Sequence, residues 1–497
     1  MRLSRLLRIA GVESLEVSGD ADVSAVTVDS RAVQPGGCFV AVVGPDADGH
    51  DYIGQAVEAG ASAVVCQRPA DLPPSVALVR VGDSASTAAH LAQAMAGWPA
   101  RKLTLLGVTG TKGKTTVSYL TRHILQREGR SVGLIGTIRY EYPGASLPAP
   151  NTTPGSVALA ELMGQMVQAG ASHAVMEVSS HALDQRRTAG LDFAAAAFTN
   201  LTGDHLDYHG TMEAYLAAKR RLFEGLSPEA TAVLNDHEDA SKAMASATGA
   251  NVLSYGVDGV EADLHARITD ADAAGTRFVM TRDGESVEVR TNLIGIYNVT
   301  NCLAAAGMCL SVGVALEGIA HALREAIHVP GRFQRVESSA PFEVIVDYAH
   351  TDDALDSVLR ALRPLAAGRL IVVFGCGGDR DRTKRPRMAA AAARWADRII
   401  VTQDNPRTED PRRIVDDILA GFDAAGRAKL HIDNDRRAAI GEAIDMARPG
   451  DLVVLAGKGH ENCQVIGSGK FHFDDAEVAA EMLRERCGAE LAEGRQP

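Results

Sequence analysis

A glycine-rich turn between an apolar run and a helical pattern constrains the fold of this chain most strongly. Residues 103–108 are apolar and predict a buried strand, and the turn that follows reads Val108-Thr-Gly-Thr-Lys-Gly-Lys-Thr-Thr116. After the turn, Val117, Leu120 and Ile124 recur at helical spacing. A strand, a glycine turn and a helix that opens with Gly-Lys-Thr are the context of a phosphate-binding P-loop. Val108 replaces the first glycine of the usual pattern, but the flanking elements disfavour a chance Gly-Lys-Thr in a loop.

The residues of this turn suit the binding of phosphate. Glycines let backbone N–H groups close around phosphate oxygens, and the N-terminus of a helix adds partial positive charge. Lys114 can reach the terminal phosphates of a nucleotide, and the Thr115 hydroxyl can hold Mg²⁺.

Length and charge narrow the class of protein. A chain of 497 residues suggests about three domains of roughly 150 residues each. The net charge of -13 disfavours broad nucleic-acid binding. No apolar run approaches the length of a membrane span, and Met1–Gly11 is too interrupted for a secretory signal, so we expect an amphipathic helix there.

The cysteines indicate the compartment. There are seven, an odd number, and none forms a Cys-x-x-Cys pair; they are Cys38, Cys66, Cys302, Cys309, Cys376, Cys463 and Cys487. This usage predicts a reducing cytoplasm, with no disulfide framework and no structural zinc.

Alternating strand and helix patterns predict an α/β fold in three domains, residues 1–99, 100–332 and 333–497. In the first domain, residues 24–30 and 37–43 are predicted strands, joined by a Pro-Gly-Gly turn. Short apolar runs separated by helices in the second domain imply a parallel sheet that is covered on both faces.

In the third domain, four predicted strands each run into a polar cluster. The clusters are Asp347–His350, Gly375–Arg380, Asp404–Arg407 and Gly457–Glu461. Ligands of open parallel sheets bind beyond the carboxyl ends of the strands. Each cluster alone could be a turn, but four together predict one shared site.

Three residues of the second domain have side chains that could act in chemistry. Glu177 ends a predicted strand near the P-loop, where a carboxylate can hold Mg²⁺. By residue type alone, His205 is more often a structural hydrogen-bonding group than a metal ligand. Lys219 lies in a helical stretch, 212–223, where a lysine is normally a solvated surface charge.

Eight motifs that occur in order resemble those of the Mur ligases, the ATP-dependent amino-acid ligases of peptidoglycan synthesis. The resemblance covers essentially the whole chain, including the Asp29-Ser-Arg31 strand. The motifs are Thr109–Thr116, Asn151–Pro154, Glu177–Leu183, Asp204–His209, Asn298–Asn301, Pro330–Arg332, Asp347–His350 and Gly457–Glu461. Within the family, Asp404-Asn-Pro-Arg407 is the signature for meso-diaminopimelate rather than lysine.

The resemblance implies a three-domain architecture, with a central P-loop domain for ATP, an N-terminal domain for the uridine end of the substrate and a C-terminal Rossmann-like domain for the amino acid. It implies ligation of meso-2,6-diaminopimelate to UDP-N-acetylmuramoyl-L-alanyl-D-glutamate through an acyl phosphate, by a cytoplasmic enzyme of cell-wall biogenesis. We expect a monomer that does not bind nucleic acid and has no membrane span.

The resemblance also assigns roles to individual residues. ATP would be held by Gly110, Thr111, Lys112, Gly113, Lys114, Thr115, Thr116, Asn298, Asn301, Arg332 and Asp347. The UDP-linked substrate would contact Val28, Ser30, Pro45, Asp46, Ala47, Asn151, Thr152, Thr153, Ser179, Gln185 and Arg187. Mg²⁺ would be held by Thr115, Glu177, His205 and a carbamate formed from CO₂ on Lys219, and the catalytic residues would be Lys114, Lys219 and His205.

The implied pocket for meso-diaminopimelate consists of Arg380, Asp404, Asn405, Pro406, Arg407, Gly457 and Glu461. Arg407 offers a planar fork to the distal carboxylate, with Arg380 as a second cation. Glu461 and the Gly457 carbonyl can accept from the distal ammonium. Lysine lacks this carboxylate, and sites built around a polar group strongly reject analogues without it.

Two other functions are considered. A sister amide ligase, either lysine-adding or a folylpolyglutamate synthetase, is disfavoured by residues 404–407 and by the Asp29-Ser-Arg31 domain. A non-catalytic nucleotide-binding homologue is disfavoured by the joint presence of Lys114, Glu177, His205 and Lys219.

Overall fold

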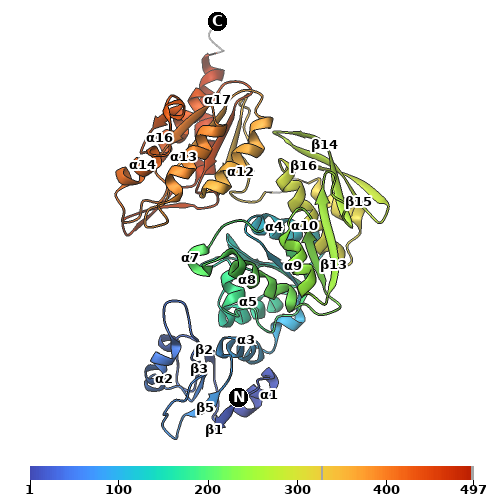
Figure 1. Cartoon of the computed structure of the whole chain (residues 1–497), viewed down its shortest axis with the longest axis vertical. Helices are drawn as coiled ribbons and strands as arrows, with labels where there is room; N and C mark the ends of the chain where they lie inside the picture. Colours follow the sequence, from blue (N-terminus) through green and yellow to red (C-terminus); the bar gives the residue numbers. More distant parts are fainter. Residues whose placement is uncertain (326–327, 494–497) are drawn as a thin grey trace. The chain divides into compact units, whose positions relative to one another are not determined.

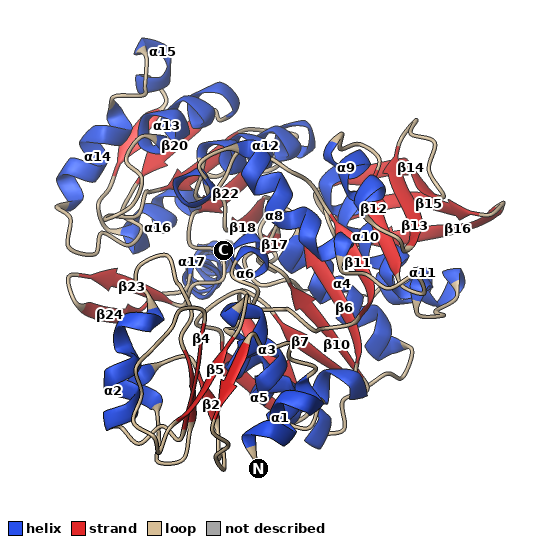
Figure 2. Ribbon diagram, turned by 60° about the horizontal axis from the view of Figure 1, so that its bottom comes forward, coloured by secondary structure: helices blue, strands red, loops and turns tan. Residues whose placement is uncertain are grey.

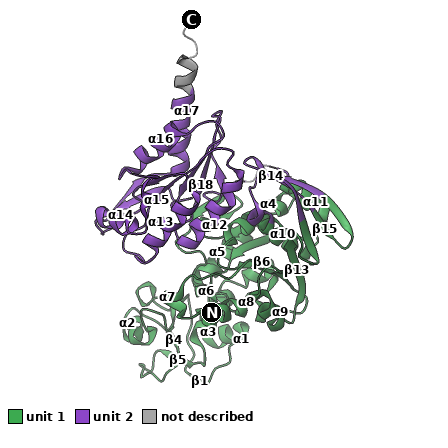
Figure 3. Ribbon diagram, turned by 45° about the horizontal axis from the view of Figure 1, so that its top comes forward, with its two compact units in different colours: residues 1–266, 280–287, 300–323 green, residues 267–279, 288–299, 324–497 purple. Residues whose placement is uncertain are grey.

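A computed structural model describes residues 1–325 and 328–493 of the chain (Figure 1). These residues form two compact units (Figure 3). Unit 1 comprises residues 1–266, 280–287 and 300–323, and unit 2 comprises residues 267–279, 288–299 and 324–497.

Unit 1 begins with a small five-stranded sheet. Its order is β1(Glu16–Ser18), β5(Ala77–Arg80), β4(Ala63–Cys66), β3(Cys38–Val40) and β2(Val26–Thr27), with helices α1(Leu3–Ala10), α2(Ile53–Glu58) and α3(Ser84–Met95). The predicted amphipathic helix is confirmed, because Leu3, Leu6 and Leu7 of α1 are buried. The predicted strand over 24–30 is shorter, because the Asp29 side chain accepts the N–H of Arg31 and turns the chain into a 3₁₀-helix.

The main sheet of unit 1 places the P-loop near its centre. Its order within the unit is β13(Asn251–Val257), β12(Thr231–Asn235), β11(Phe193–Phe198), β6(Thr104–Thr109), β10(His173–Glu177), β7(Val132–Ile135), β8(Arg139–Tyr142) and β9(Ala145–Pro148). The pairs from β13 to β7 are parallel, as predicted, whereas β8 and β9 add an antiparallel edge. In β6 and β10, Val108 pairs with Glu177, which brings the P-loop and this carboxylate to one end of the sheet.

The helices of this region are α4(Lys114–Arg127), α5(Ser156–Gln168), α6(Ser180–Asp184), α7(Leu206–His209), α8(Met212–Glu224), α9(Ala240–Ala247) and α11(Leu316–Leu323). Apolar side chains of α5, α8 and α9 join those of the sheet in one buried cluster. Strands β14(Leu264–Asp272), β15(Gly275–Arg282) and β16(Glu285–Thr291) and helix α10(Ile296–Ser311) are divided between the two units.

Unit 2 contains a six-stranded sheet with helices on both faces (Figure 2). Its order is β17(Gln334–Arg335), β18(Glu343–Asp347), β22(Leu452–Ala456), β19(Leu370–Phe374), β20(Arg398–Val401) and β21(Leu430–Ile432). One core contains α12(Asp352–Leu362), α13(Lys384–Trp395) and α14(Pro411–Leu419), and the other contains α16(Arg436–Met446) and α17(Asp475–Glu493). The remaining elements are α15(Ala424–Arg427) and the hairpin β23(Cys463–Ile466) and β24(Gly469–His472).

The four strands predicted to end in polar clusters are β18, β22, β19 and β20, and they are consecutive neighbours with parallel pairing. Their carboxyl ends therefore lie side by side, as the sequence predicted. This edge of unit 2 carries the polar clusters.

Candidate functional site

The P-loop of unit 1 adopts a conformation that only glycine supports at two positions. Gly110 has φ +147°, and a Cβ there would lie 1.9 Å from Thr199 Oγ1. Gly113 has φ +85° and immediately precedes α4, and a Cβ there would lie 2.5 Å from Asn301 Oδ1. The loop therefore passes close to both side chains, and Asn301, a predicted ATP ligand, lies beside it.

Two residues that follow β11 hold this loop in place. Asn200 accepts the N–H of Thr111 through its carbonyl at 2.9 Å and the N–H of Lys112 through Oδ1 at 2.9 Å. Thr199 donates its hydroxyl to the Lys112 carbonyl at 2.6 Å. The sequence assigned neither residue a role, because a backbone contact across the sheet leaves no local pattern.

Glu177 and Thr115, both predicted metal ligands, are in direct contact. Thr115 Oγ1 donates to Glu177 Oε2 at 3.0 Å, and Thr137 donates to both carboxylate oxygens. Glu177 is fully buried. A hydroxyl and a carboxylate are oxygen ligands of the kind that Mg²⁺ takes, so this donor set fits the ion. Thr137 is a residue that sequence reasoning missed.

The two lysines predicted to be catalytic share one acceptor. Lys114 Nζ donates to the Gly110 carbonyl at 2.9 Å, and Lys219 Nζ donates to the same oxygen at 2.7 Å. Lys219 is 1% exposed, so its placement contradicts the usual solvated helical lysine. Burial, with the nearby charge of Lys114, lowers the pKa of Lys219 well below its ordinary value.

His205 lies in a group of histidine and tyrosine rings. Its ring centroid is 4.9 Å from that of His181 and 6.2 Å from that of Tyr215. Burial lowers the pKa of His205, and the charges of Lys114 and Lys219 act in the same direction. Its φ of +54° places it in the left-handed region, just before α7. This backbone conformation is uncommon outside glycine and is typical of functional positions.

Most residues predicted to hold the muramoyl-dipeptide part form one hydrogen-bonded group. Thr153 Oγ1 accepts from the N–H of Ser179 at 3.0 Å, and its carbonyl accepts from Arg187 at 2.8 Å. Arg187 also donates to Gln185. Thr152 contacts Thr137, which links this group to Glu177, whereas Asn151 is exposed.

The residues predicted to hold the uridine lie in the small N-terminal sheet region. Val28 is 41% exposed, and Pro45, Asp46 and Ala47 form an exposed turn that the Gly44 N–H closes. Ser30 is buried and donates to Gln55 at 2.9 Å. The hydroxyl of Ser30 is thus already engaged by its own domain.

Arg332 and Asp347, two of the predicted ATP ligands, belong to unit 2, and Asp347 is the last residue of β18. Asp347 accepts the N–H groups of Phe333 and Ala349, each at 2.9 Å, and burial raises its pKa. Arg332 lies over the Tyr348 ring at 4.7 Å, and its buried Nε has no hydrogen-bond partner among the described residues. Asn298, on α10, donates to the Ile294 carbonyl.

The loop after β20 holds Arg407 in a strained conformation. Arg407 has φ +53°, and its backbone exchanges hydrogen bonds with β23 and the turn after it, through the Val465 carbonyl and the Gly467 N–H. Arg407 Nη1 donates to the Gly378 carbonyl at 2.8 Å. A Cβ on Gly377 would lie 2.9 Å from this Nη1 and 3.9 Å from Arg380 Cγ, so the two predicted arginines lie close together.

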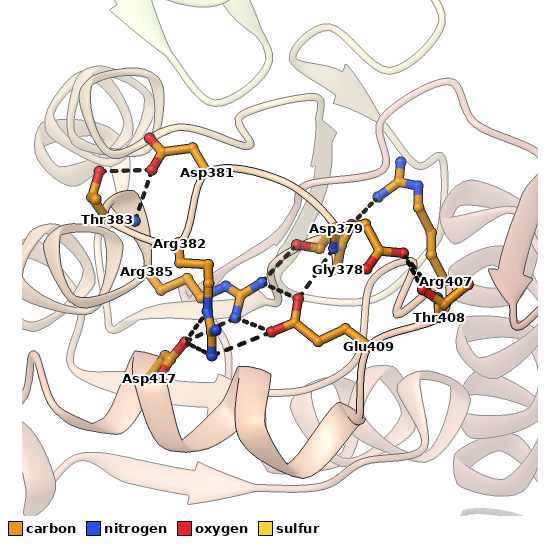
Figure 4. Close-up of polar contacts among 11 residues, drawn as sticks. Gly378, Asp379, Asp381, Arg382, Thr383, Arg385, Arg407, Thr408, Glu409 and Asp417 are labelled. Carbon is orange, nitrogen blue, oxygen red and sulfur yellow. Dashed lines mark hydrogen bonds and ion pairs between the residues drawn. The ribbon is translucent and has the colours of Figure 1, made fainter. Parts of the chain in front are cut away.

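An ionic network around the buried Arg385 braces the same loops (Figure 4). Arg385 is fully buried and pairs with Glu409 at 2.7 Å and Asp417 at 2.9 Å. Glu409 also accepts the N–H of Asp379, whose carboxylate accepts from the backbone and hydroxyl of Thr408. Pairing with Arg385 lowers the pKa of Glu409 to about 2. Sequence reasoning missed this network.

The other predicted amino-acid ligands lie around the same strand ends. Asp404 is buried and its Oδ2 would lie 2.9 Å from a Cβ on Gly457, while Pro406 is also buried. Asn405 donates to Glu461 Oε2 at 2.7 Å. The structure therefore brings together Asp404–Arg407, Gly457, Glu461 and Arg380, as the sequence predicted.

Neither a cluster of metal-ligating side chains nor a membrane-spanning helix is found among the described residues. No group of three or more His, Cys, Asp and Glu side chains in residues 1–325 and 328–493 has the arrangement of a metal site. No helix in that part of the chain combines the length and apolar character that crossing a membrane requires.

Comparisons with known proteins match nearly the whole chain. The family models "Mur ligase family, catalytic domain", "Mur ligase middle domain" and "Mur ligase, glutamate ligase domain" match residues 22–99, 108–309 and 331–459.

Curated relatives named UDP-N-acetylmuramoyl-L-alanyl-D-glutamate–2,6-diaminopimelate ligase include one from Geobacillus thermodenitrificans, 45% identical over 94% of this chain and 96% of its own length. The relative of the same name from Gloeobacter violaceus is 44% identical over 98% of this chain and 99% of its own. A solved structure of a ligase with this name has a TM-score of 0.70 and 33% identity, covering 94% of this chain and 95% of its own.

Proposed function

Because the chain belongs to the Mur ligase family, an ATP-dependent ligase family, we propose that it joins meso-2,6-diaminopimelate to UDP-N-acetylmuramoyl-L-alanyl-D-glutamate. The observation that carries this choice of amino acid is the fixed Arg407 beside Asn405 and Glu461 at one sheet edge. A cationic fork and a carboxylate at one edge suit a ligand end that bears both a carboxylate and an ammonium.

Arg407 is the selective element of the proposed pocket. Its guanidinium is planar and charged, and one Nη1 donor is used on the Gly378 carbonyl. The remaining donors are available in type and geometry for the distal carboxylate of diaminopimelate, with Arg380 as a second cation. Lysine has no distal carboxylate to pair with this guanidinium. A site built around a polar group strongly rejects an analogue that lacks the group.

We place the phosphate chemistry at the P-loop. Lys114 and the N–H groups of residues 110–116 would hold the ATP phosphates, and Asn298, Asn301, Arg332 and Asp347 the rest of the nucleotide. Thr115 and Glu177, with His205 and a carboxylated Lys219, would hold Mg²⁺. The ion, when bound, would neutralise phosphate charge.

Carboxylation of Lys219 is favoured by its surroundings. Burial and the charge of Lys114 lower the pKa of Lys219, which favours the neutral amine, the form that attacks CO₂. The new N–C bond forms as one C=O π bond opens to an oxyanion, and the amine loses a proton. The product would place an anion beside the Lys114 ammonium, where the two amines share the Gly110 carbonyl.

The proposed reaction proceeds in two balanced steps. The γ-carboxylate of the D-glutamyl residue attacks the terminal phosphorus of ATP, giving an acyl phosphate and ADP. The neutral amine of diaminopimelate then attacks the acyl carbon. The tetrahedral adduct expels inorganic phosphate, the nitrogen gives up its extra proton to that phosphate, and an amide remains. Lys114 would stabilise the negative charge on the transferring phosphoryl group.

The other assignments remain part of the proposal. We propose the division into domains 1–99, 100–332 and 333–497, which the ranges of the three family models support. Val28, Ser30 and the turn at 45–47 would bind the uridine end, and Thr153, Ser179 and Arg187 the dipeptide end. We propose a cytoplasmic monomer, since the substrates are small polar molecules.

The test is ADP release by the purified protein with ATP, Mg²⁺ and the UDP-linked dipeptide. Release that requires meso-diaminopimelate and is slow with L-lysine is expected. Release that depends equally on L-lysine would identify a lysine-adding ligase. Absence of release with either amino acid, in a folded protein that binds ATP, would indicate a non-catalytic homologue and overturn the proposal.

A further inference from the structure

Lys458 is a fully buried cation beside the proposed amino-acid pocket. It lies in the Gly457–Glu461 cluster after β22, and its side chain is 0% exposed. Its ammonium donates to the Cys463 carbonyl at 2.6 Å, to Asn405 Oδ1 at 3.3 Å and to Glu461 Oε2 at 3.3 Å. A lysine ammonium has three donors and no acceptor, so these three oxygens use it completely.

The contacts of Lys458 determine how the Asn405 amide is turned. Asn405 Oδ1 accepts from Lys458 and from the Val465 N–H at 2.9 Å. A flipped amide would direct its NH₂ group at an ammonium and at an N–H, which no hydrogen bond could satisfy. The Nδ2 of Asn405 must therefore point the other way, and it donates to Glu461 Oε2 at 2.7 Å.

The same contacts orient the Glu461 carboxylate. Oε2 receives two donors, one from Lys458 and one from Asn405, whereas Oε1 has no hydrogen bond within the described residues. The Glu461 side chain remains 30% exposed although Lys458 is buried. One oxygen is thus fixed on the protein side, and the other is presented outward.

We propose that Lys458 is a positioning residue that fixes Asn405 and Glu461 for the distal ammonium of the amino-acid substrate. The inference rests on the proposed function, because that function supplies the ligand. Lys458 would not touch the substrate. A buried cation here is compensated by one partner carboxylate, and removing it would free Glu461 to rotate and Asn405 to flip.

The test compares wild type with Lys458→Met, a neutral side chain of similar length. Steady-state ADP release is measured at varied meso-diaminopimelate, ATP and nucleotide substrate. We expect the KM for meso-diaminopimelate to rise about tenfold or more, which is the effect of losing a hydrogen bond to a charged group. We expect the KM values for ATP and the nucleotide to change less than about twofold.

A double-mutant cycle distinguishes a positioning role of Lys458 from a general loss of rigidity in unit 2. Glu461→Gln alone should raise the KM for meso-diaminopimelate, but it should add little in the Lys458→Met protein, because Glu461 is no longer oriented there. Additive effects would overturn the proposal. If Lys458→Met does not fold, Lys458→Gln is used in the same cycle, since it can still donate to a backbone carbonyl.

The matched control is Arg369→Met. Arg369 pairs with the buried Asp451 at 2.6 Å, before β19 and β22, at the opposite end of the same strands. This variant should lower the Tm without a specific rise in the KM for meso-diaminopimelate. An equal rise in the control would overturn the inference. Wild type that does not use meso-diaminopimelate would instead overturn the proposed function.

Discussion

At the scale of single residues, the central feature is a pair of lysine amines on one carbonyl oxygen. Lys114 and Lys219 both donate to the Gly110 carbonyl, and only Lys219 is fully enclosed. Burial, together with the charge of Lys114, lowers the pKa of Lys219. The proposed function accordingly gives the two lysines different roles, Lys114 toward phosphate and Lys219 toward the metal ion.

The first prediction concerns Lys114. Lys114→Ala should lower kcat by about 10²–10³-fold, because it removes a preorganised charge from the developing phosphate charge. ADP release measures the effect, and the Tm verifies the fold. Lys242→Ala is the control, since this lysine of the same unit is 84% exposed. Substantial activity in folded Lys114→Ala would contradict the P-loop assignment.

The second prediction concerns Lys219. Lys219→Ala should be nearly inactive, and short carboxylates such as acetate should partly restore ADP release by supplying the missing anion. The rescue should saturate with carboxylate concentration and be absent in Lys114→Ala. Full activity without added carboxylate would contradict carboxylation, and so would an unmodified lysine in a high-resolution map of the active enzyme.

The sequence motifs name many of the candidate site residues, but few of the residues that hold them in place. Lys114, Glu177 and Arg407 stand in recognisable motifs. Thr137, Asn200 and Lys458 act through contacts with residues distant in the chain, and such contacts have no local spacing. The burial of Lys219 was also missed, although the helix carries a signal for it: Lys219 lies four residues after Tyr215 and three before Leu222, on the buried face of α8.

At the scale of elements, the loops after β19 and β20 are joined by ion pairs to the buried Arg385. Arg385, at the start of α13, binds Glu409 beyond β20 and Asp417 on α14. Through Asp379 and Thr408, the same network reaches the segment that accepts from Arg407 (Figure 4). The network therefore holds the two loops at a fixed separation.

The third prediction concerns Glu409→Gln. It should destabilise unit 2 by about 1–3 kcal/mol, because the buried Arg385 loses one of its two paired carboxylates and keeps only Asp417. It should also raise the KM for meso-diaminopimelate, because the loop near Arg407 loosens. Asp417→Asn is the control: it weakens the same arginine but does not contact Asp379, so it should lower the Tm alone. Equal KM effects in both variants would contradict the account.

The pH dependence of this variant has a defined sign. Pairing with Arg385 lowers the pKa of Glu409 to about 2 in the folded protein. The ion pair therefore makes its full contribution to the free energy of unfolding when the pH is above the ordinary pKa of a glutamate. That stability is lost as the pH falls from about 4.5 towards 2. The difference in Tm between wild type and Glu409→Gln should therefore narrow below pH about 4.5. A constant difference over that range would contradict the ion pair.

The strands of the main sheets were predicted well, and the hairpins were not. Residues 370–374 and 193–198 are continuous apolar runs, and the structure gives β19 and β11 over the same residues. The hairpin β23 and β24 has exposed or half-buried residues throughout, so its pattern resembles a loop. Its two strands pair with each other, and the loop at 404–407 adds a bridge between Arg407 and Ile466.

At the scale of the whole molecule, the proposed reaction uses residues of both compact units. The P-loop and Lys219 belong to unit 1, and Arg407, Asn405 and Glu461 belong to unit 2. The family assignment covers both, whereas the contacts proposed for the amino acid all lie in unit 2. The preference for one amino acid over another can therefore be tested by changing a single side chain.

The most direct test measures kcat/KM for meso-diaminopimelate and for L-lysine with wild type and Arg407→Ala. Wild type should strongly prefer diaminopimelate. Breaking a buried charge pair costs about 3–5 kcal/mol, less with solvent access, so Arg407→Ala should lose about 10²–10⁴-fold with diaminopimelate and far less with lysine. Equal use of lysine by wild type, or equal loss with both amino acids in Arg407→Ala, would contradict the account.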